Sequence, residues 1–221
     1  MSVRAGASGF SFATWRPGFY PPGLRSDGFL AFYAQRLPTV ELNTTFYRVP
    51  QAAQLERWAA AVPDGFRFAV KAPRALSVGG RLEHAGWFGE RVRALGDRLG
   101  PVLVRLADDR RRDDAFLIAL VGALPEDLDV VLDLRDPSWD GVEPLLAGLG
   151  AVRVNDLEAP GRLRYVRFRD PPYDDAALRA WARRLAALDG DVFAFFRHED
   201  APTAPAYAAR LLELTAGRFR P

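Results

Sequence analysis

Two kinds of segment alternate regularly along this chain, and the alternation limits the folds open to it. Short apolar runs typical of strands occur eight times, at residues 3–6, 39–43, 66–72, 101–107, 129–136, 151–156, 164–170 and 191–198. Segments with apolar residues at helical spacing lie between most of them, at residues 28–37, 52–62, 87–99, 114–124, 142–149, 176–188 and 205–216. Strict alternation indicates a parallel sheet. Eight repeats predict an α/β fold of the closed (β/α)₈ TIM-type barrel class, with a doubly wound open sheet as the alternative.

The link between the sixth and seventh strand-like runs is short. Residues 157–163 join them, and seven residues leave no room for a helix, so we expect an incomplete sixth crossover. The chain of 221 residues is also somewhat shorter than the roughly 250 residues typical of such barrels. No linker, low-complexity tract or charge block divides it, which predicts a single barrel domain over residues 1–221.

Residue types that are missing or rare narrow the chemistry. The absence of cysteine excludes disulfides, thiolate nucleophiles and Cys-ligated metal centres. Only His84 and His198 are present, too few for a histidine-rich metal centre, and no phosphate-binding P-loop or dinucleotide fingerprint occurs. We therefore expect neither a bound metal nor a cofactor, with Mg²⁺ held by Glu41, Asp133 or Asp156 as the remaining metal alternative.

The apolar runs and the net charge bear on location and partners. The first ten residues lack the apolar core of a signal peptide, and the longest uncharged apolar run, residues 115–125, is too short to span a bilayer. We expect a cytoplasmic protein without membrane contact. The formal net charge of +2 is small for this length and does not by itself argue for nucleic acid. The sequence leaves the oligomeric state open.

One strand-like run becomes polar at its end, within residues 39–50, TVELNTTFYRVP. Side chains alternate along a strand, so Glu41 and Asn43 share one face. The loop that follows adds Tyr47 and Arg48, which can stack on a ligand and bind an anion. Folds of the α/β class build their sites directly after strands, although a polar face that simply meets water is the plain alternative.

Charged and polar residues gather at the ends of the other strand-like runs as well. In the second, fifth and seventh runs they lie two residues apart, so they share a face, and the apolar residues between them are expected to pack on helices. The polar face should therefore point into the barrel, at the end where barrel enzymes carry their sites. The candidate catalytic residues are Glu41, Lys71 and Asp133, and the candidate substrate-binding residues are Asn43, Tyr47, Arg48, Arg105, Arg135, Trp139, Arg167, Arg169, Arg197 and His198.

These candidates carry more positive than negative charge. Six cations face mainly Glu41 and Asp133, and they are Lys71, Arg105, Arg135, Arg167, Arg169 and Arg197. Buried charges persist only when paired, so a structural ion-pair network across the end of the barrel is one interpretation. The excess of arginine favours another, in which an anionic small molecule completes the charge balance, because guanidinium groups suit phosphate and carboxylate.

Lys71 is the only lysine among the 30 Lys and Arg residues. Codon bias accounts for much of this imbalance. A lone lysine also marks a position where the planar, permanently charged guanidinium group of arginine could not perform the same function. Glu41 and Lys71 end adjacent strands on inward faces, so we expect their charged groups within hydrogen-bonding reach and Lys71 to stay protonated. Crowding by arginines would instead lower the pKa of Lys71 and make it a base or a Schiff-base nucleophile.

Several segments resemble one known family. They are SGFSFATWRPGFYPPGL (residues 8–24), FYAQRLPTVELNTTFYRVP (32–50), RWAAAVPDGFRFAVKAPRAL (57–76), LGDRLGPVLVRL (95–106), DLRDPSW (133–139) and YVRF (165–168). In these segments, and through nearly its whole length, the chain resembles the DUF72 family, also called YecE-like proteins. The resemblance implies a TIM-type barrel and brings no established activity.

The second half of the candidate site departs from the pattern of that family. Arg105 stands where the family has a glutamine. Asp136 and Arg169 stand in place of histidines, and the pair Arg197-His198 stands in place of two asparagines. The departures imply either a substrate different from that of typical members or a decayed activity.

Three functions fit this pattern. The first is an enzyme acting on a small phosphorylated or carboxylated molecule, with Glu41 and Lys71 as acid–base or charge-stabilising partners and the arginines as a clamp. The second is a nucleic-acid-binding or phosphodiester-processing protein that uses the arginines on phosphates and the aromatic residues on bases. The third is a catalytically degenerate barrel that serves as a binding protein.

Overall fold

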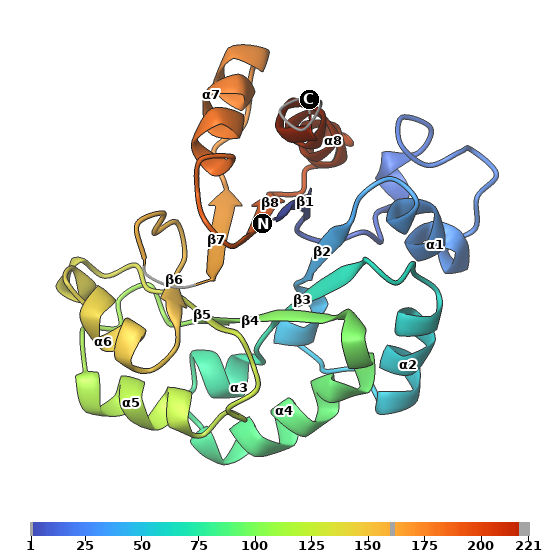
Figure 1. Cartoon of the computed structure of the whole chain (residues 1–221). Helices are drawn as coiled ribbons and strands as arrows, with labels where there is room; N and C mark the ends of the chain where they lie inside the picture. Colours follow the sequence, from blue (N-terminus) through green and yellow to red (C-terminus); the bar gives the residue numbers. More distant parts are fainter. Residues whose placement is uncertain (1, 160–161, 217–221) are drawn as a thin grey trace.

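Eight parallel strands form one sheet that curves into a ring, with helices around the outside (Figure 1). The computed structural model describes residues 2–159 and 162–216. The strands are β1 (Ser2–Ala7), β2 (Thr39–Leu42), β3 (Arg67–Lys71), β4 (Leu99–Arg105), β5 (Val130–Asp133), β6 (Val152–Arg153), β7 (Leu163–Phe168) and β8 (Asp191–Phe196). Hydrogen bonds join them in the order β6-β5-β4-β3-β2-β1-β8-β7. The predicted TIM-type barrel class is therefore confirmed.

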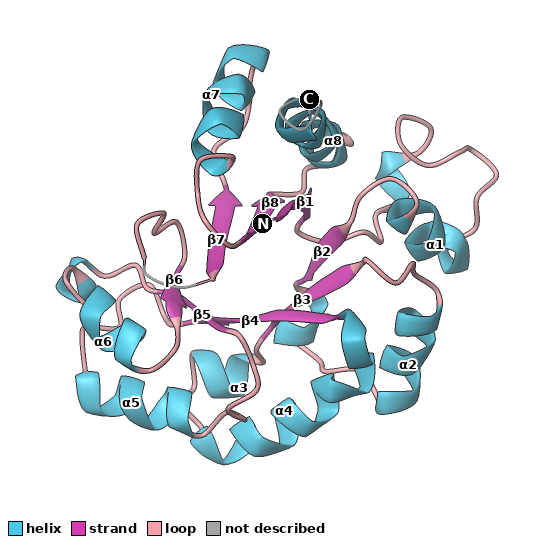
Figure 2. Cartoon of the chain, in the orientation of Figure 1, coloured by secondary structure: helices cyan, strands magenta, loops and turns pink. Residues whose placement is uncertain are grey.

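The helices follow the predicted alternation, as Figure 2 shows by colour. They are α1 (Phe29–Ala34), α2 (Ala52–Ala60), α3 (Arg74–Ser77), α4 (Ala85–Val92), α5 (Asp114–Gly122), α6 (Glu143–Gly148), α7 (Asp175–Leu185) and α8 (Thr203–Ala216). Two begin where an aspartate caps the first turn: Asp113 accepts from the Phe116 amide at 2.9 Å and Asp174 from the Ala177 amide at 2.7 Å.

Two helical details differ from the sequence prediction. Helix α3 was not predicted, because four residues are too few to show a helical period. The segment 87–99, predicted as one helix, divides into α4 and a 3₁₀ segment, Arg93–Arg98. Gly96 within that segment has a φ of 53°, which is outside the helical range and which glycine adopts at little cost.

Among the described residues, β6 and β7 form no ladder of paired residues, and Asn155 makes hydrogen bonds to β7 that complete the ring. Its backbone amide donates to the carbonyl oxygen of Tyr165 at 2.9 Å. Its side-chain oxygen accepts from the Arg167 amide at 2.8 Å, and its side-chain nitrogen donates to the Arg167 carbonyl oxygen at 3.4 Å. Asn155 makes these bonds with a φ of 64°, in the left-handed region that asparagine tolerates better than most residues.

The connection from β6 to β7 contains no helix in its described residues, 154–159 and 162. Of the predicted crossover at residues 157–163, residues 160 and 161 lie outside the described part and Leu163 already belongs to β7. The buried side chain of Arg164 braces this connection, since its Nε donates to the Leu157 carbonyl oxygen at 3.0 Å.

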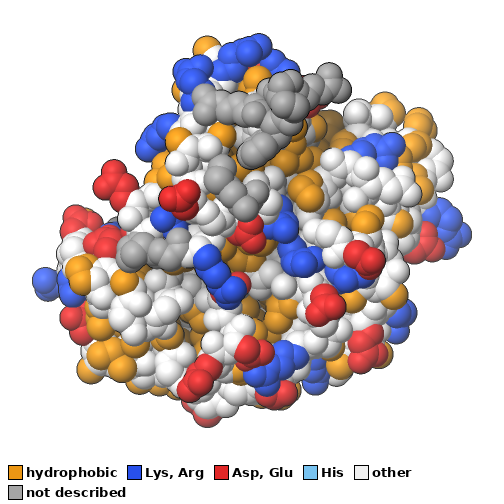
Figure 3. Space-filling model, viewed as in Figure 1, with side chains coloured by type: hydrophobic (Ala, Val, Ile, Leu, Met, Phe, Trp, Pro, Cys, Tyr) orange, Lys and Arg blue, Asp and Glu red, His pale blue; other side chains and the backbone are white. Residues whose placement is uncertain are grey.

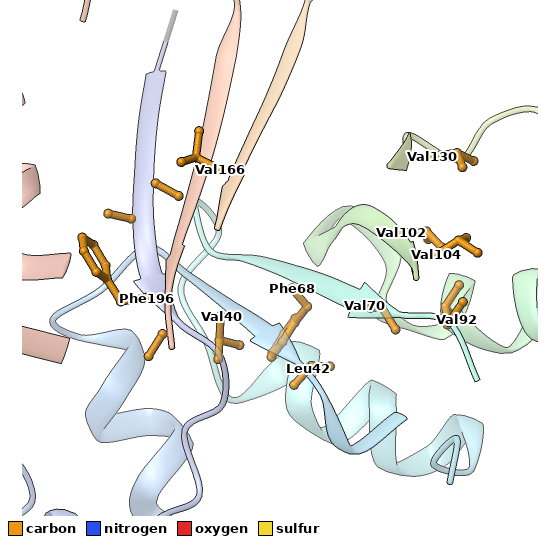
Figure 4. Close-up of a cluster of buried hydrophobic side chains, with 14 of the residues drawn as sticks. Val40, Leu42, Phe68, Val70, Val92, Val102, Val104, Val130, Val166 and Phe196 are labelled. Atoms are coloured by element: carbon orange, nitrogen blue, oxygen red, sulfur yellow. The ribbon is translucent and has the colours of Figure 1, made fainter. Parts of the chain in front are cut away.

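The apolar core has an outer and an inner part. The outer part lies between the strands and the helices, and Figure 4 shows Val40, Leu42, Phe68, Val70 and other members side by side along successive strands. The inner part fills the barrel, and its members include Ala69, Leu103, Val131, Tyr165, Phe193 and Phe195. Residues of alternate parity thus point to opposite faces, as predicted. The face seen in Figure 3 mixes basic with acidic side chains, in keeping with the small net charge.

Candidate functional site

The carboxyl ends of the strands, here called the mouth, bring three distant charged residues together inside the barrel. Arg167 of β7 donates through Nη2 to Glu41 Oε1 of β2 at 2.7 Å and through Nη1 to Asp133 Oδ2 of β5 at 2.8 Å. Glu41 is 0% exposed, and Asp133 and Arg167 are also buried. One guanidinium group therefore holds two buried carboxylates, which makes the ion-pair interpretation correct for Arg167.

Two further groups satisfy Glu41. The Tyr165 hydroxyl donates to Oε2 at 2.7 Å, and the Asn43 amide nitrogen donates to Oε1 at 2.8 Å. Burial, followed by the charge of Glu41, raises the pKa of Tyr165 well above its ordinary value. The phenol stays protonated and keeps donating, so three donors, from Tyr165, Asn43 and Arg167, fix the position of the Glu41 side chain.

Lys71, at the end of β3, lies in this charged interior without a carboxylate partner. The residue is 8% exposed, and its ammonium nitrogen lies 4.0 Å from the centre of the Phe46 ring. Within residues 2–159 and 162–216, no carboxylate oxygen comes within 4.0 Å of it. The predicted Glu41–Lys71 contact is therefore wrong. Register gives the reason, because Glu41 pairs with Ala69 on β3, two residues before Lys71, and Arg167 occupies the carboxylate.

The pKa of Lys71 also departs from the expectation of an ordinary charged lysine. Burial lowers it most, and the positive charge of Arg167 lowers it further. Glu41, Arg105 and Asp133 act more weakly, with the two carboxylates opposing the shift. The net direction is downward, which corresponds to the alternative in which arginine crowding makes the amine easier to deprotonate.

A second level of arginines surrounds Asp133. Arg135 Nε lies 3.3 Å from Asp133 Oδ1 and 3.6 Å from Asp108 Oδ1. Arg169 Nη2 lies 3.6 Å from Asp133 Oδ2 and is buried, and it has no hydrogen-bond partner among the residues that the structure describes. Arg105 Nη2 donates to Asp108 Oδ1 at 2.6 Å, and this bond lowers the pKa of Asp108. The carboxylate of Asp108 thus balances part of the expected excess of positive charge. The carboxylate of Asp133 lies within 4.0 Å of three arginines, Arg135, Arg167 and Arg169.

A cavity of about 820 Å³ opens beside the ends of β5, β6 and β7. Asp133, Arg135, Arg167 and Arg169 contribute to its lining, and the other lining residues are Leu134, Glu143, Arg153, Val154, Asn155, Asp156, Glu158, Ala159 and Asp170. Arg153 is neutralised by Glu143 at 2.9 Å. The lining of the cavity therefore combines arginines with carboxylates, in a volume suited to a small molecule.

Comparison with known proteins settles the family. A model of the family described as "Protein of unknown function DUF72" matches residues 4–220. The chain belongs to the DUF72 family. A DUF72 family protein of Thermotoga maritima MSB8 has a similar structure, with a TM-score of 0.80 and 21% identity over 98% of this chain and 100% of that one. A DUF72 family protein of Enterococcus faecalis V583 also gives 0.80, at 17% identity over 97% and 96%. At these identities the likeness concerns the fold.

Two curated relatives align over shorter stretches. UPF0759 protein YecE of Escherichia coli (strain K12) is 30% identical over 112 residues, which are 48% of this chain and 41% of that protein. UPF0759 protein YunF of Bacillus subtilis (strain 168) is 36% identical over 58 residues, 26% of this chain and 21% of that protein. The aligned part thus spans less than half the length of either relative.

The remaining predicted site residues of this DUF72 chain lie in different surroundings. Tyr47 is 84% exposed and Arg48 is exposed beside it. Arg197 is exposed and has no ion pair within the described ranges, and the exposed His198 stacks on Phe12 with 4.6 Å between ring centres. Trp139 requires a correction. It is fully buried, and its indole nitrogen donates to the Arg110 carbonyl oxygen at 2.7 Å, so it supports a loop and does not line the cavity.

Three residues of this DUF72 site were missing from the sequence-based list. Tyr165 could have been found, because it shares its inward face with Arg167 two residues later. Asp108 and Asn155 lie just beyond the ends of strands. The sequence shows that these positions are polar, but it does not show which residues they bond. In the part of the chain described here, no three Asp, Glu or His residues are grouped to hold a metal ion. Nor does that part contain a helix long and apolar enough to cross a bilayer.

Proposed function

We propose that this DUF72 protein is an enzyme that binds a small phosphorylated or carboxylated molecule in the cavity at the mouth of its barrel. One observation carries the proposal. Arg135 and Arg169 share the carboxylate of Asp133 with Arg167, which already holds it at 2.8 Å. The second carboxylate near Arg135, that of Asp108, already accepts a hydrogen bond from Arg105. The buried Arg169 Nη2 is left without a hydrogen bond, and an anion in the cavity would supply the missing acceptor.

Two features favour an enzyme over a binding protein. The site lies at the carboxyl ends of barrel strands, where barrel enzymes act, and it holds rigidly positioned groups of both signs. Lys71 adds a group able to react, because its amine lies in the same interior with a lowered pKa. In this proposal Arg135 and Arg169 bind the anion, Glu41, Asp133 and Arg167 fix the wall of the site, and Lys71 acts on the substrate.

The proposal is tested by measuring thermal unfolding and calorimetric binding with sulfate, inorganic phosphate and a panel of phosphate esters and carboxylates. At least one anion is expected to stabilise the fold by roughly 1 to 3 kcal/mol at saturation. Arg169→Gln should weaken that binding about 10- to 100-fold, because a charge-assisted hydrogen bond is lost.

Arg162→Gln provides a control of equal charge. Arg162 directly precedes β7, so it lies at the end of the barrel opposite the mouth. Its side chain is 83% exposed and pairs with Asp129. Its substitution should leave anion binding unchanged. An unshifted unfolding temperature across the whole panel, or equal losses for the two variants, would contradict the proposal. Binding without turnover of any ligand would favour a degenerate binding protein.

A second candidate function rests on Tyr47. This side chain is 84% exposed directly before the exposed Arg48, and an aromatic ring beside a cation suits single-stranded nucleic acid. Binding of a fluorescent oligonucleotide should then weaken steeply with salt and fall further in Tyr47→Ala. Oligonucleotide binding that is unaffected by Tyr47→Ala would count against this candidate.

A further inference from the structure

Three carboxylates in the lining of the cavity have no cationic partner among the residues that the structure describes. These unpaired carboxylates belong to Asp156, Glu158 and Asp170. The other two carboxylates of the lining are bound by arginines. Arg167 holds Asp133 at 2.8 Å, and Arg153 holds Glu143 at 2.9 Å. The lining therefore carries uncompensated negative charge as well as the arginines around Asp133.

Two of the unpaired carboxylates lie on a braced part of the connection between β6 and β7 (Figure 1). The backbone amide of Glu158 donates to Asp156 Oδ1 at 3.0 Å, which ties the two residues together. Leu157, between them, is held through its carbonyl oxygen by the buried Arg164, whose Nε lies 3.0 Å away. The backbone that carries these carboxylates is thus fixed at the cavity.

The unpaired carboxylates and the arginines share the cavity without meeting. The guanidinium nitrogens of Arg135 and Arg169 approach Asp133, at 3.3 and 3.6 Å, and none of them lies within 4.0 Å of an unpaired carboxylate. This holds even for Asp170, which directly follows Arg169 in the chain. Opposite charges that line one volume and stay apart leave room for a ligand that contacts both. A ligand with negative charge alone would instead be repelled by the carboxylates.

We infer that the ligand of this cavity is a small zwitterion, a molecule that carries an ammonium group together with a phosphate or carboxylate group. The acid group binds Arg135 and Arg169, and the ammonium group donates its N–H groups to the unpaired carboxylates. Amino sugar phosphates, aminoalkyl phosphates and amino acids have this chemistry. The inference rests on the proposed function, because it keeps the anion site and adds a second group that the cavity recognises.

The test compares ligands that differ in the ammonium group. Calorimetric binding is measured at pH 7 and low ionic strength for three pairs: glucosamine 6-phosphate with glucose 6-phosphate, phosphoethanolamine with ethyl phosphate, and 4-aminobutyrate with butyrate. In at least one pair the zwitterion should bind about tenfold or more tightly than its partner, as expected for a charge-assisted hydrogen bond. Ethylamine, which has no acid group, should bind more weakly than phosphoethanolamine. This comparison uses the unaltered protein, so it does not depend on the folding of any variant.

A site variant and a matched control variant then locate the ammonium group. The site variant combines Asp156→Asn, Glu158→Gln and Asp170→Asn. Asparagine at position 156 keeps an oxygen for the Glu158 amide, so the backbone bond is preserved. The control variant combines Asp97→Asn, Glu126→Gln and Asp189→Asn, which are exposed residues just before β4, β5 and β8, at the opposite end of the barrel.

The two variants lose the same charge, so the contrast between them reports position. The site variant should bring the affinity ratio of each pair close to one, and it should bind ethyl phosphate at least as tightly as the unaltered protein because the repulsion is gone. The control variant should leave the ratios unchanged. Thermal unfolding of both variants without ligand checks that they are folded.

Four results would overturn the inference. If anions bind through Arg169 but no zwitterion binds more tightly than its partner, the zwitterion is wrong while the proposed function stands. If no anion or zwitterion binds, both fail. If ethylamine binds as tightly as phosphoethanolamine, the acid group plays no part. If the preference for the ammonium group survives in the site variant or is lost equally in the control, the unpaired carboxylates do not bind it.

Discussion

Arg167 is the residue on which the interior of the mouth depends. Its guanidinium group is the cation that bonds both Glu41 and Asp133, and all three residues are buried. Removing one partner of a buried ion pair leaves an uncompensated charge, which costs about 3 to 5 kcal/mol. Arg167→Met should therefore lower the free energy of unfolding by about that amount, as measured by urea denaturation.

Arg169→Met is the matched control, because Arg169 shares Asp133 but its side chain is 33% exposed and 3.6 Å away. It should cost less than about 1 kcal/mol. Adding Glu41→Gln to Arg167→Met should recover part of the loss, since a neutral amide needs no cation. A cost for Arg167→Met no larger than that of Arg169→Met would show that the carboxylates find other partners.

At this scale the sequence predicted which residues meet but not how they pair. The alternation of side chains along a strand predicted that Glu41, Asp133 and Arg167 point into the barrel, and the structure brings them together. Parity cannot show that one guanidinium group will take both carboxylates, because that depends on the stagger of strands far apart in the ring. The sequence singled out the lone Lys71, and the structure gives its ammonium group an aromatic ring as a neighbour in place of the expected Glu41.

At the scale of elements, the contact between β6 and β7 is the weakest part of the sheet. β6 has two residues, and Asn155 makes the hydrogen bonds that join it to β7. Asn155→Gly keeps the φ of 64° accessible but leaves the Arg167 amide without its side-chain acceptor, and should cost about 1 to 3 kcal/mol. Asn155→Ala should cost about 1 kcal/mol more, because alanine is strained in the left-handed region.

Hydrogen exchange of the Arg167 amide distinguishes the two effects in these variants. Both substitutions should speed exchange at that amide while leaving exchange at β3 and β4 unchanged, because the hydrogen bond is lost locally. Equal stability of the Gly and Ala variants would show that φ is not strained in the native protein. Slow exchange at Arg167 in both would show that the side-chain bond does not hold the strands together.

The elements themselves were largely predictable, with differences at their ends. A strand ends where its ladder stops, and the sequence does not contain that information: β6 was predicted over 151–156 but pairs only over Val152–Arg153. The incomplete crossover followed from length alone, since too few residues separate the two strands. Helix α3 left no periodic signal, so it could not have been predicted in this way.

For the whole molecule, the sequence was most informative about the fold. Eight alternations of strand and helix leave few ways to bury both faces of a parallel sheet, so the barrel follows from pattern and count. The cavity of about 820 Å³ was not predictable, because its lining combines the ends of β5, β6 and β7 with residues 154–159 and 170, and the sequence does not show how these segments are placed relative to one another. The chemistry of the cavity depends on how its charged side chains are arranged in space, and a single sequence does not determine that arrangement.

Buried tyrosines should determine how the whole molecule responds to alkali. The hydroxyls of Tyr20, Tyr33 and Tyr165 donate to Phe10, Thr39 and Glu41, respectively, and burial is the first cause that raises the pKa of each above 10.0. A neutral acid whose pKa is raised by folding stabilises the fold fully below its unfolded pKa. That stability is lost as the pH rises from about 10 towards the folded pKa, because the unfolded chain then releases the proton more easily.

Each of these tyrosines should remove about 1.4 kcal/mol of stability per pH unit above pH 10. We therefore expect cooperative unfolding in alkali, with phenolate absorbance of the three rising together with the loss of circular dichroism. Tyr33→Phe removes one titrating group and should make the pH dependence shallower by one proton, although it lowers stability at neutral pH because the Ala7 amide and the Thr39 carbonyl lose their shared partner. Full phenolate absorbance in a protein that is still folded would show that these hydroxyls are accessible to base, and the structural role assigned to them would be wrong.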